Sequence, residues 1–331
     1  MPPLEIHNVK VVAPARLHLG FLDLNGGLGR GFGSLGLYLE EICTELSLSP
    51  SAEITASGPG AERALRNAEL LLTHFKIDGG VAIDIRRAIP EHVGLGSGTQ
   101  MAMAVGMGVN KLFGLQLALH DLVSILDRGR RSGVGIGAFN LGGFIVDGGR
   151  SESTLVPPVI AHCEVPAEWR FVLVQDRTHQ GIHGADEIKA FEQLPPMDEA
   201  TVGRICRLVL MQLLPAVHEK NCERFGDAIS RVQEMVGGYF APVQGGIYLS
   251  TAVEKAVYLL ERHGAKGTGQ SSWGPTGFAI FPNETDAYQA IKQTRKKNEG
   301  GDIIEFHVCR ARNRGAEIVV DDSVIGKYRK Q

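Results

Sequence analysis

The hydrophobic and polar positions follow two different periods along the chain. Residues 5–20 begin with alternating apolar and polar positions rich in β-branched side chains, and residues 37–49 alternate in the same way, as strands do. Apolar residues in the segment 60–76 recur at helical intervals and predict an amphipathic helix. Further strands are predicted over residues 80–90, 170–176 and 302–308, and a strand pair over 132–149. Further helices are predicted over residues 99–112, 120–130, 185–193, 198–215, 218–235, 251–263 and 285–297.

The uneven order of these elements predicts an α+β fold with two lobes and a cleft between them. A chain of 331 residues is long enough for about two domains. Because the proline-bearing stretch 153–169 lies between the two halves, we expect domains over residues 1–160 and 161–331.

Composition and charge exclude several classes of protein. The formal net charge of −3 gives no overall attraction to nucleic acid or to a membrane surface. No segment approaches the roughly 18 uninterrupted apolar residues expected of a membrane span. The five cysteines lack metal-binding spacing and indicate reduced thiols. We therefore expect a cytoplasmic protein without a nucleic-acid or membrane partner.

The 42 glycines are clustered, and the cluster at residues 94–100, GLGSGTQ, directly precedes a predicted helix. Helix N-termini carry unpaired N–H groups and a positive dipole end, so they attract anions. Glycine lets the preceding turn adopt positive φ and approach a ligand closely. The alternative is a tight strand-to-helix turn without a ligand. The spacing matches neither a P-loop nor a dinucleotide fingerprint.

Longer strings carry a family resemblance. PEHVGLGSGTQ (90–100) resembles the phosphate loop of the GHMP kinase superfamily, and APARLHLG (13–20) stands where its first motif gives the opening strand. The second glycine cluster, which contains GTGQSSWGPTGF (267–278), resembles the C-terminal glycine-rich loop that meets the first loop across the cleft. After Gly-Leu-Gly the kinases usually have two adjacent serines, whereas here Gly98 follows Ser97 and removes the second hydroxyl. Together with RLHLGFLDLNGGLGRGFGSLGL (16–37) and RSGVGIGAFNLGGFIVDGG (131–149), these strings resemble one branch, the β-ribofuranosylaminobenzene 5′-phosphate synthases of the methanopterin pathway.

This resemblance implies a GHMP kinase-like two-lobed fold with the active site in the cleft between the lobes. It implies decarboxylating phosphoribosyl transfer from phosphoribosyl pyrophosphate to 4-aminobenzoate or 4-hydroxybenzoate, with release of CO2 and pyrophosphate. The sequence leaves the choice between these acceptors open. Mg2+ on the pyrophosphate and a homodimer are further expectations.

Residues that bind phosphoribosyl pyrophosphate, the phosphoribosyl donor, are expected in both glycine clusters. They are Gly94, Gly96, Ser97, Gly98, Thr99, Gln100, Gly267, Gly269, Gln270, Ser271 and Ser272. Ser97 is also a candidate N-cap residue of the helix. Trp273 is a candidate wall for the benzoate ring, with core packing as its alternative. His183 and Glu187, in a stretch that resembles the synthases, are the other candidates for acceptor binding.

Four residues near the start of the chain are candidates for catalysis. Arg16 and Arg30 carry guanidinium groups that bind carboxylate or phosphate in bidentate fashion, with surface ion pairs as the alternative. His18 lies two residues from Arg16 on the same strand face, where it is either functional or a core histidine. Asp23 is either a ligand for Mg2+ or the cap of an Asx turn.

Other interpretations compete with this one. An ATP-dependent GHMP-family kinase and a non-catalytic metabolite-binding protein share the fold and are kept as alternatives. The run Arg128, Arg130, Arg131 is typical of a solvated face, with attraction of pyrophosphate as the minor alternative. The segment 317–328 resembles a phosphoribosyltransferase motif, but its loop is short and lacks a threonine before the glycine, so we reject it.

Overall fold

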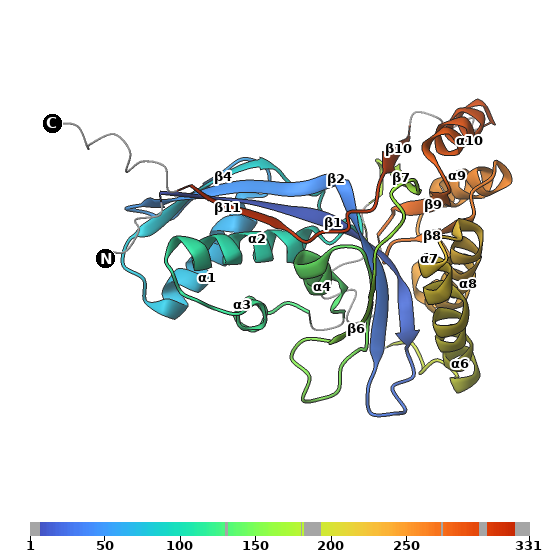
Figure 1. The fold of residues 1–331 in the computed structure, drawn as a ribbon, viewed down its shortest axis with the longest axis horizontal. Coiled ribbons are helices and arrows are strands. Elements are labelled where there is room, and N and C mark those ends of the chain that lie inside the picture. Colours follow the sequence, from blue (N-terminus) through green and yellow to red (C-terminus); the bar gives the residue numbers. More distant parts are fainter. Residues whose placement is uncertain are drawn as a thin grey trace.

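A computed structural model describes residues 7–129, 132–179, 181, 193–272, 274–297 and 303–321. One large sheet forms the first lobe, with strand order β11-β1-β2-β4-β3, and with β5 paired to β2 and β6 paired to β5 (Figure 1). All its pairs are antiparallel except β3 with β4. The strands are β1 (Asn8–Asp23), β2 (Phe32–Ser51), β3 (Thr55–Ser57), β4 (Gly80–Arg87), β5 (Phe144–Asp147), β6 (Val159–Cys163) and β11 (Glu317–Asp321).

Four helices cover one face of this sheet. They are α1 (Ala61–Phe75), α2 (Ser97–Leu112), α3 (Leu119–Ile125) and α4 (Val134–Leu141) (Figure 1). Helix α2 is almost entirely buried because its Ala, Met, Val and Gly residues pack between the sheet and the other helices. The helices predicted over 60–76, 99–112 and 120–130 are confirmed, although α3 ends at Ile125.

The strand pair predicted over residues 132–149 is half wrong, because α4 occupies the first apolar segment and only β5 is a strand. Glycine in α4 allows close packing rather than breaking a strand. A Cβ atom on Gly135 would lie 3.1 Å from Thr99 Cγ2, and one on Gly137 would lie 2.7 Å from Val159 Cγ2. Strand-like composition therefore concealed a short helix held against its neighbours by small residues.

The second lobe has a smaller antiparallel sheet of order β10-β7-β9-β8 with helices packed on it. Its strands are β7 (Arg170–Asp176), β8 (Gly267–Gln270), β9 (Gly277–Phe281) and β10 (Ile304–Cys309). Its helices are α6 (Glu199–Leu208), the π-helical turn η1 (Val209–Leu213), α7 (Leu214–His218), α8 (Cys222–Gln244), α9 (Thr251–Arg262) and α10 (Glu284–Lys297). The helices predicted at 198–215, 218–235, 251–263 and 285–297 are thus confirmed, whereas the one at 185–193 lies almost wholly outside the described residues.

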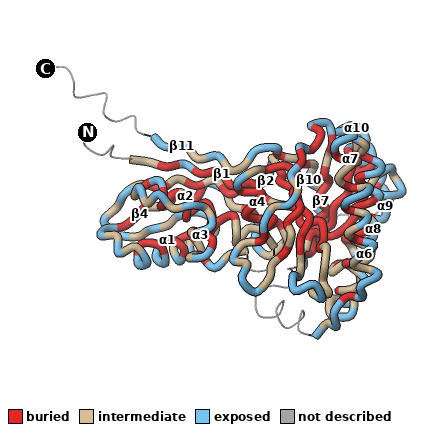
Figure 2. The backbone as a smooth tube through the Cα atoms, turned by 60° about the horizontal axis from the view of Figure 1, so that its bottom comes forward, coloured by how far each residue is buried: buried red, intermediate tan, exposed pale blue. Residues whose placement is uncertain are grey.

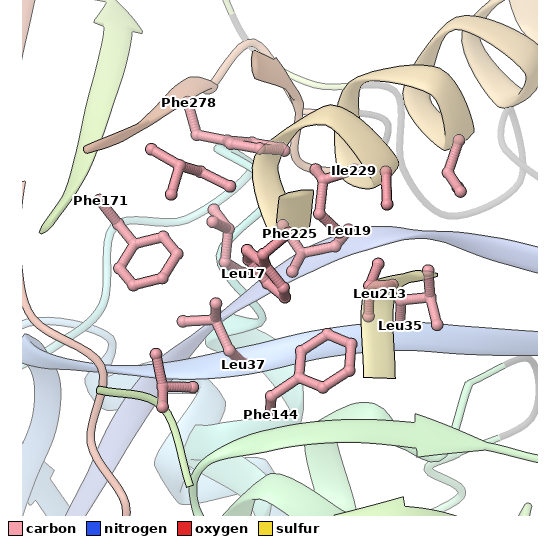
Figure 3. Packing of buried hydrophobic residues seen from close by; sticks show 14 of the residues in the cluster. Leu17, Leu19, Leu35, Leu37, Phe144, Phe171, Leu213, Phe225, Ile229 and Phe278 are labelled. Atoms are coloured by element: carbon pink, nitrogen blue, oxygen red, sulfur yellow. The ribbon is translucent and has the colours of Figure 1, made fainter. Parts of the chain in front are cut away.

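The two lobes share one core. Leu17, Leu19 and Leu35 from the long β1–β2 hairpin pack against Phe225 and Ile229 of α8 (Figure 3). Buried residues are concentrated along β1, β2 and β7, where the lobes meet (Figure 2). The hairpin therefore belongs to both lobes and holds them together.

The chain does not divide cleanly at residue 160. Strand β6 spans that position, and β11 returns from the end of the described chain to pair with β1, matching Asn8 to Asp321. Arg312 reinforces the return, because it donates to Glu40 at 2.8 Å. The domains expected over 1–160 and 161–331 are thus tied together by the last strand, which occupies the start of the rejected 317–328 motif.

One helical run among the described residues, Glu199–His218, is long and apolar enough to cross a membrane. A single such run is weak evidence, because core helices of globular proteins have the same length and composition. Ile205, Val209 and Leu213 of this run are buried in the shared core.

Candidate active site

The glycine cluster at residues 94–100 forms the turn that leads into α2. Gly94 and Gly96 have φ values of 83° and 80°, which side chains other than hydrogen resist. Gly96 is the N-cap residue, so the expectation that Ser97 would cap the helix is wrong. The first N–H groups of α2 have no partner from the preceding turn of the helix, and the helix dipole adds positive potential.

Arg16 contacts this turn through both its backbone and its side chain. Its backbone N–H donates to the Leu95 carbonyl at 3.1 Å, and its Nη1 donates to the Gly94 carbonyl at 2.7 Å. A Cβ atom on Gly96 would lie 2.9 Å from Arg16 Cγ, so glycine at this position leaves room for the arginine. These contacts of Arg16 therefore stabilise the conformation of the turn.

Ser271 joins the two glycine clusters. Its hydroxyl donates to the Gly94 carbonyl at 2.8 Å and accepts the backbone N–H of His18 at 3.0 Å. On the same side, a Cβ atom on Gly274 would lie 2.4 Å from the Gly94 nitrogen. The prediction that the clusters meet is confirmed, and the contact requires glycine on both sides.

The second cluster is mostly not a loop. Gly267 and Gly269 belong to β8, which pairs with β9, and both are buried. Added Cβ atoms would lie 2.5 Å from Gly226 Cα and 2.4 Å from Gln233 Cγ, both on α8. The expectation that residues from 267 onward form an anion-binding loop is wrong, because these glycines let a helix pack on a strand. The loop begins at Ser271, and Ser272 follows with a φ of 55°.

Arg63, which sequence reasoning missed, lies at the start of α2, and Arg128 lies close to Arg63. Arg63 Nη1 lies 3.5 Å from Ser97 Oγ, and Arg63 Nη2 pairs with Glu91 at 3.2 Å. Burial, and then the positive charge of Arg63, lower the pKa of Arg128. Among the described residues, the buried Nε atom of Arg128 has no hydrogen-bond partner. Two like charges, one of them also paired with Glu91, thus lie near an anion-attracting helix end.

The expectation of a solvated face therefore fails for Arg128, while Arg130 and Arg131 lie outside the described residues. The basic run was visible in the sequence, but the partial burial of Arg128 was not. No sequence pattern pointed to Arg63, because only the packing of α1 on α2 brings it to Ser97.

His18 is buried on β1, with 2% of its surface exposed. Burial, and then the charge of Arg16, hold the pKa of His18 well below its usual value, so the ring is neutral. Its Nδ1 accepts the backbone N–H of Gly20 at 3.4 Å, whereas its Nε2 has no partner. His18 thus lies in the predicted site, with one nitrogen unused.

Gln100 and Thr99 point into the fold. Gln100 is buried, donates to the Gly135 carbonyl at 2.8 Å, and accepts from the Tyr38 hydroxyl at 3.1 Å. Both polar atoms of its amide are therefore hydrogen-bonded within the core. This corrects the expectation that Gln100 binds phosphoribosyl pyrophosphate. Thr99 packs against α4 at Gly135, and Gly98 faces Arg63.

Asp23 and Arg30 lie elsewhere on the β1–β2 hairpin. Asp23 Oδ1 accepts the N–H groups of Asn25 and Gly26 at 2.7 and 2.9 Å, which is the Asx turn of the alternative interpretation. It is seven residues beyond Arg16, or about 23 Å along an extended strand. Arg30 is exposed, and its Nη1 donates to the carbonyls of Gly148 and Gly149 at 3.2 and 2.7 Å. The structure therefore brings together Arg16, His18 and the glycine turn, but not Asp23 or Arg30.

The candidates for acceptor binding, Trp273, His183 and Glu187, lie outside the described residues. Among the described residues, no group of three or more His, Cys, Asp or Glu side chains is placed to hold a metal ion. A Mg2+ ion at this site would therefore have to take most of its ligands from substrate phosphates and water.

Known proteins resemble this chain over nearly its full length. The models of the GHMP kinases N terminal domain and of the GHMP kinases C terminal match residues 62–146 and 213–300. A β-ribofuranosylphenol 5′-phosphate synthase of Archaeoglobus fulgidus is 32% identical over 94% of this chain and 100% of its own. The chain belongs to the β-ribofuranosylphenol 5′-phosphate synthase family. Another member, from Methanocaldococcus jannaschii, is 30% identical over 93% of this chain and 99% of its own.

Membership of this family confirms the resemblance predicted from the sequence, and the chain is a pentosyltransferase of the methanopterin pathway. These relatives are synthases of a ribofuranosylphenol, whereas the branch predicted from the sequence makes a ribofuranosylaminobenzene. Solved structures show the fold alone. A mevalonate kinase from L. major has a TM-score of 0.67 at 16% identity, covering 91% of this chain and 96% of its own. A homoserine kinase from Cytophaga hutchinsonii has a TM-score of 0.64 at 18% identity, covering 94% and 97%.

Proposed function

We propose that this enzyme transfers the phosphoribosyl group of phosphoribosyl pyrophosphate to 4-hydroxybenzoate. The products are a β-ribofuranosylphenol 5′-phosphate, CO2 and pyrophosphate. The family name supports the hydroxyl compound over 4-aminobenzoate, because it describes a ribose 5′-phosphate joined to a phenol.

The chemistry follows from the acceptor. The para hydroxyl pushes electron density onto the ring carbon that bears the carboxylate. That carbon forms a bond to C1 of the ribose while the bond from C1 to pyrophosphate breaks. Loss of CO2 returns its bonding electron pair to the ring and restores aromaticity. The site must therefore hold a pyrophosphate, a 5′-phosphate and a flat aromatic acid in one cleft.

The observation that carries the proposal is the cationic site at the start of α2. Arg63 lies beside Ser97 in the first turn of the helix, and Arg128 is close enough to Arg63 to respond to its charge, so this end of α2 is suited to an anion. Preorganised donors of this kind stabilise the charge that develops on a leaving pyrophosphate. Mg2+, when bound with the donor, supplies further charge neutralisation there.

Arg16 and His18 are assigned to the acceptor side of this site. Arg16 reaches the turn at Gly94, and its charge is close enough to His18 to lower the pKa of that ring. A guanidinium beside the reacting centre is suited to the benzoate carboxylate. The neutral ring of His18 is suited to an uncharged part of the same molecule.

The cellular setting is also proposed. The cysteines of the chain are unpaired, which supports a reducing, cytoplasmic location. Leu210 and Met211 on η1 are 61% and 73% exposed, which supports association of two chains into a homodimer through this face. Light scattering of the purified protein tests the dimer.

The decisive experiment follows carboxyl-labelled 4-hydroxybenzoate with phosphoribosyl pyrophosphate and Mg2+. We expect labelled CO2 and pyrophosphate in equal amounts. Consumption of ATP without CO2 release would instead identify a GHMP-family kinase. Stabilisation by phosphoribosyl pyrophosphate without any turnover of either benzoate would identify a metabolite-binding protein.

A further inference from the structure

A small cavity lies between β1 and α8, beside the candidate active site. His18, Phe21, Phe240 and Gln244 line it together with Gln270, and the remaining lining residues are Gly20, Gln233, Val236, Gly237, Ile247 and Ser272. Its inner volume is about 20 Å³, enough for one water-sized group. None of the described lining residues carries a charge at neutral pH. The cavity therefore suits a single uncharged polar atom at the end of an apolar or aromatic body.

The hydrogen-bonding pattern of His18 defines what that atom must do. A backbone N–H can only donate, so the Nδ1 atom that faces Gly20 carries the lone pair. The proton of the neutral ring is then on Nε2, which has no acceptor in the part of the chain that the structure describes, although His18 is only 2% exposed. Buried donors without a partner are rare in folded proteins and point to a missing acceptor. The geometry calls for a ligand atom that accepts a hydrogen bond.

The amides on the opposite wall offer the complementary function. Gln270 is held in place by its Oε1, which accepts the N–H of Leu249 at 2.7 Å, and by its Nε2, which donates to the Ser272 carbonyl at 3.2 Å. Its Nε2 also lies 3.5 Å from Gln244 Oε1, which retains capacity to accept another hydrogen bond. An atom in the cavity can thus accept from His18 and donate to an amide oxygen.

We propose that this cavity binds the para hydroxyl of the aromatic acceptor and that His18 Nε2 is the residue that selects hydroxyl over amino. This inference rests on the proposed function for the identity of the acceptor. A phenolic oxygen accepts a hydrogen bond and donates one. An aromatic amine has its lone pair delocalised into the ring, so it presents donors only and leaves Nε2–H without an acceptor.

The placement of Arg16 agrees with this orientation. Arg16 and His18 are on the same face of β1, in a stretch paired regularly with Tyr38 and Gly36 of β2. Alternate strand residues are separated by about 6.6 Å, comparable to the length of a para-substituted benzoate. The molecule can therefore present its carboxylate toward Arg16 and its hydroxyl to His18, with Phe21 and Phe240 beside the ring.

The test compares His18→Leu and His18→Gln in the intact enzyme, with 4-hydroxybenzoate and 4-aminobenzoate as acceptors. Loss of one neutral hydrogen bond predicts that kcat/KM for the hydroxyl compound falls about 2- to 13-fold in His18→Leu, mainly through KM. The ratio of the kcat/KM values for the hydroxyl and amino compounds should fall by about the same factor, and the KM for phosphoribosyl pyrophosphate should change less than the KM for the acceptor. Glutamine places an N–H donor near the position of Nε2 and should restore part of the preference.

His263→Leu is the matched control, because His263 Nε2 is also buried without a partner but lies after α9, away from the cavity. It should leave the acceptor preference unchanged. An unchanged acceptor preference in His18→Leu, with equal losses or no losses for the two acceptors, would overturn the assignment while leaving the proposed reaction intact.

Calorimetric binding of the two benzoates separates this inference from the proposed function. If the wild-type protein shows no turnover but binds 4-hydroxybenzoate in a His18-dependent manner, the cavity assignment holds and the reaction fails. If the wild-type protein binds neither benzoate, alone or with phosphoribosyl pyrophosphate, both are overturned.

Discussion

Arg128 gives the sharpest test of the anion site, because its substitution should change stability and binding in opposite directions. In Arg128→Met the methylene stem keeps its packing, while the charge beside Arg63 and the unpaired Nε atom disappear. A buried donor without a partner costs about 1–3 kcal/mol. Because Arg128 is only half-buried, we expect the lower end, a gain of about 1 kcal/mol in the free energy of unfolding without ligand.

The loss in binding should be larger. A hydrogen bond to a charged group contributes about 1.5–3 kcal/mol, which corresponds to a roughly 13- to 160-fold weaker affinity for pyrophosphate or phosphoribosyl pyrophosphate. Urea denaturation measures the first quantity and calorimetry the second. Added pyrophosphate should therefore stabilise the wild-type protein more than the variant.

Arg86→Met is the matched control, because Arg86 is an exposed arginine on β4 that pairs with Glu45 at 3.3 Å. Its stability should change by less than about 0.5 kcal/mol and its pyrophosphate affinity not at all. The reasoning is refuted if Arg128→Met destabilises the unliganded protein and binds pyrophosphate normally, since Arg128 would then be a structural residue.

Four further predictions concern the same site. Gly96→Val should cost about 1–2 kcal/mol for its positive φ, displace Arg16 and abolish donor binding, and a folded variant with normal affinity for phosphoribosyl pyrophosphate would contradict this. Arg16→Lys should slow turnover at saturating substrates because lysine lacks the planar fork, whereas Arg30→Lys should leave turnover unchanged; the reverse result in steady-state kinetics would return Arg30 to the acceptor. The pKa of His18 in the folded protein lies below its unfolded value of about 6.5, so the unfolded state takes up the proton first as the pH falls. The free energy of unfolding therefore decreases as the pH drops below that value. Denaturation measured between pH 7.5 and 5 should show a smaller decrease in His18→Leu. Exhaustive treatment with EDTA should abolish CO2 release and added Mg2+ should restore it, and full activity without the cation would disprove its role.

Much of the fold could be predicted because local patterns and tertiary structure agree there. The apolar face of α1 and the glycine turn before α2 are visible in the sequence, since hydrophobic spacing and positive φ act over a few residues. Residues 267–270 were predicted as a loop but form a strand. Glycine permits both loops and close packing, and only the position of α8 decides between them.

The site was predicted in part for the same reason. Arg16 and His18 lie on one strand next to the first cluster, so their proximity is local. Arg63 lies on α1 and Arg128 follows α3, so the approach of Arg63 to Ser97 and of Arg128 to Arg63 depends on long-range packing. Arg30 looked functional because glycines frame it, yet those glycines build a hairpin whose carbonyls the guanidinium binds.

The pairing of β11 with β1 has a consequence for how the protein is made. The partners Val12 and Glu317 are separated by almost the whole chain, so β1 emerges from the ribosome long before its neighbour exists. At roughly 5–20 residues per second, the nascent chain waits about 15 to 60 s for that neighbour. During this time one side of β1 presents unpaired N–H and C=O groups, which are a template for pairing with other chains. Completion of the first lobe thus waits for the synthesis of residues 317–321, and a ribosome that stalls before residue 317 leaves an open sheet for chaperones to cover.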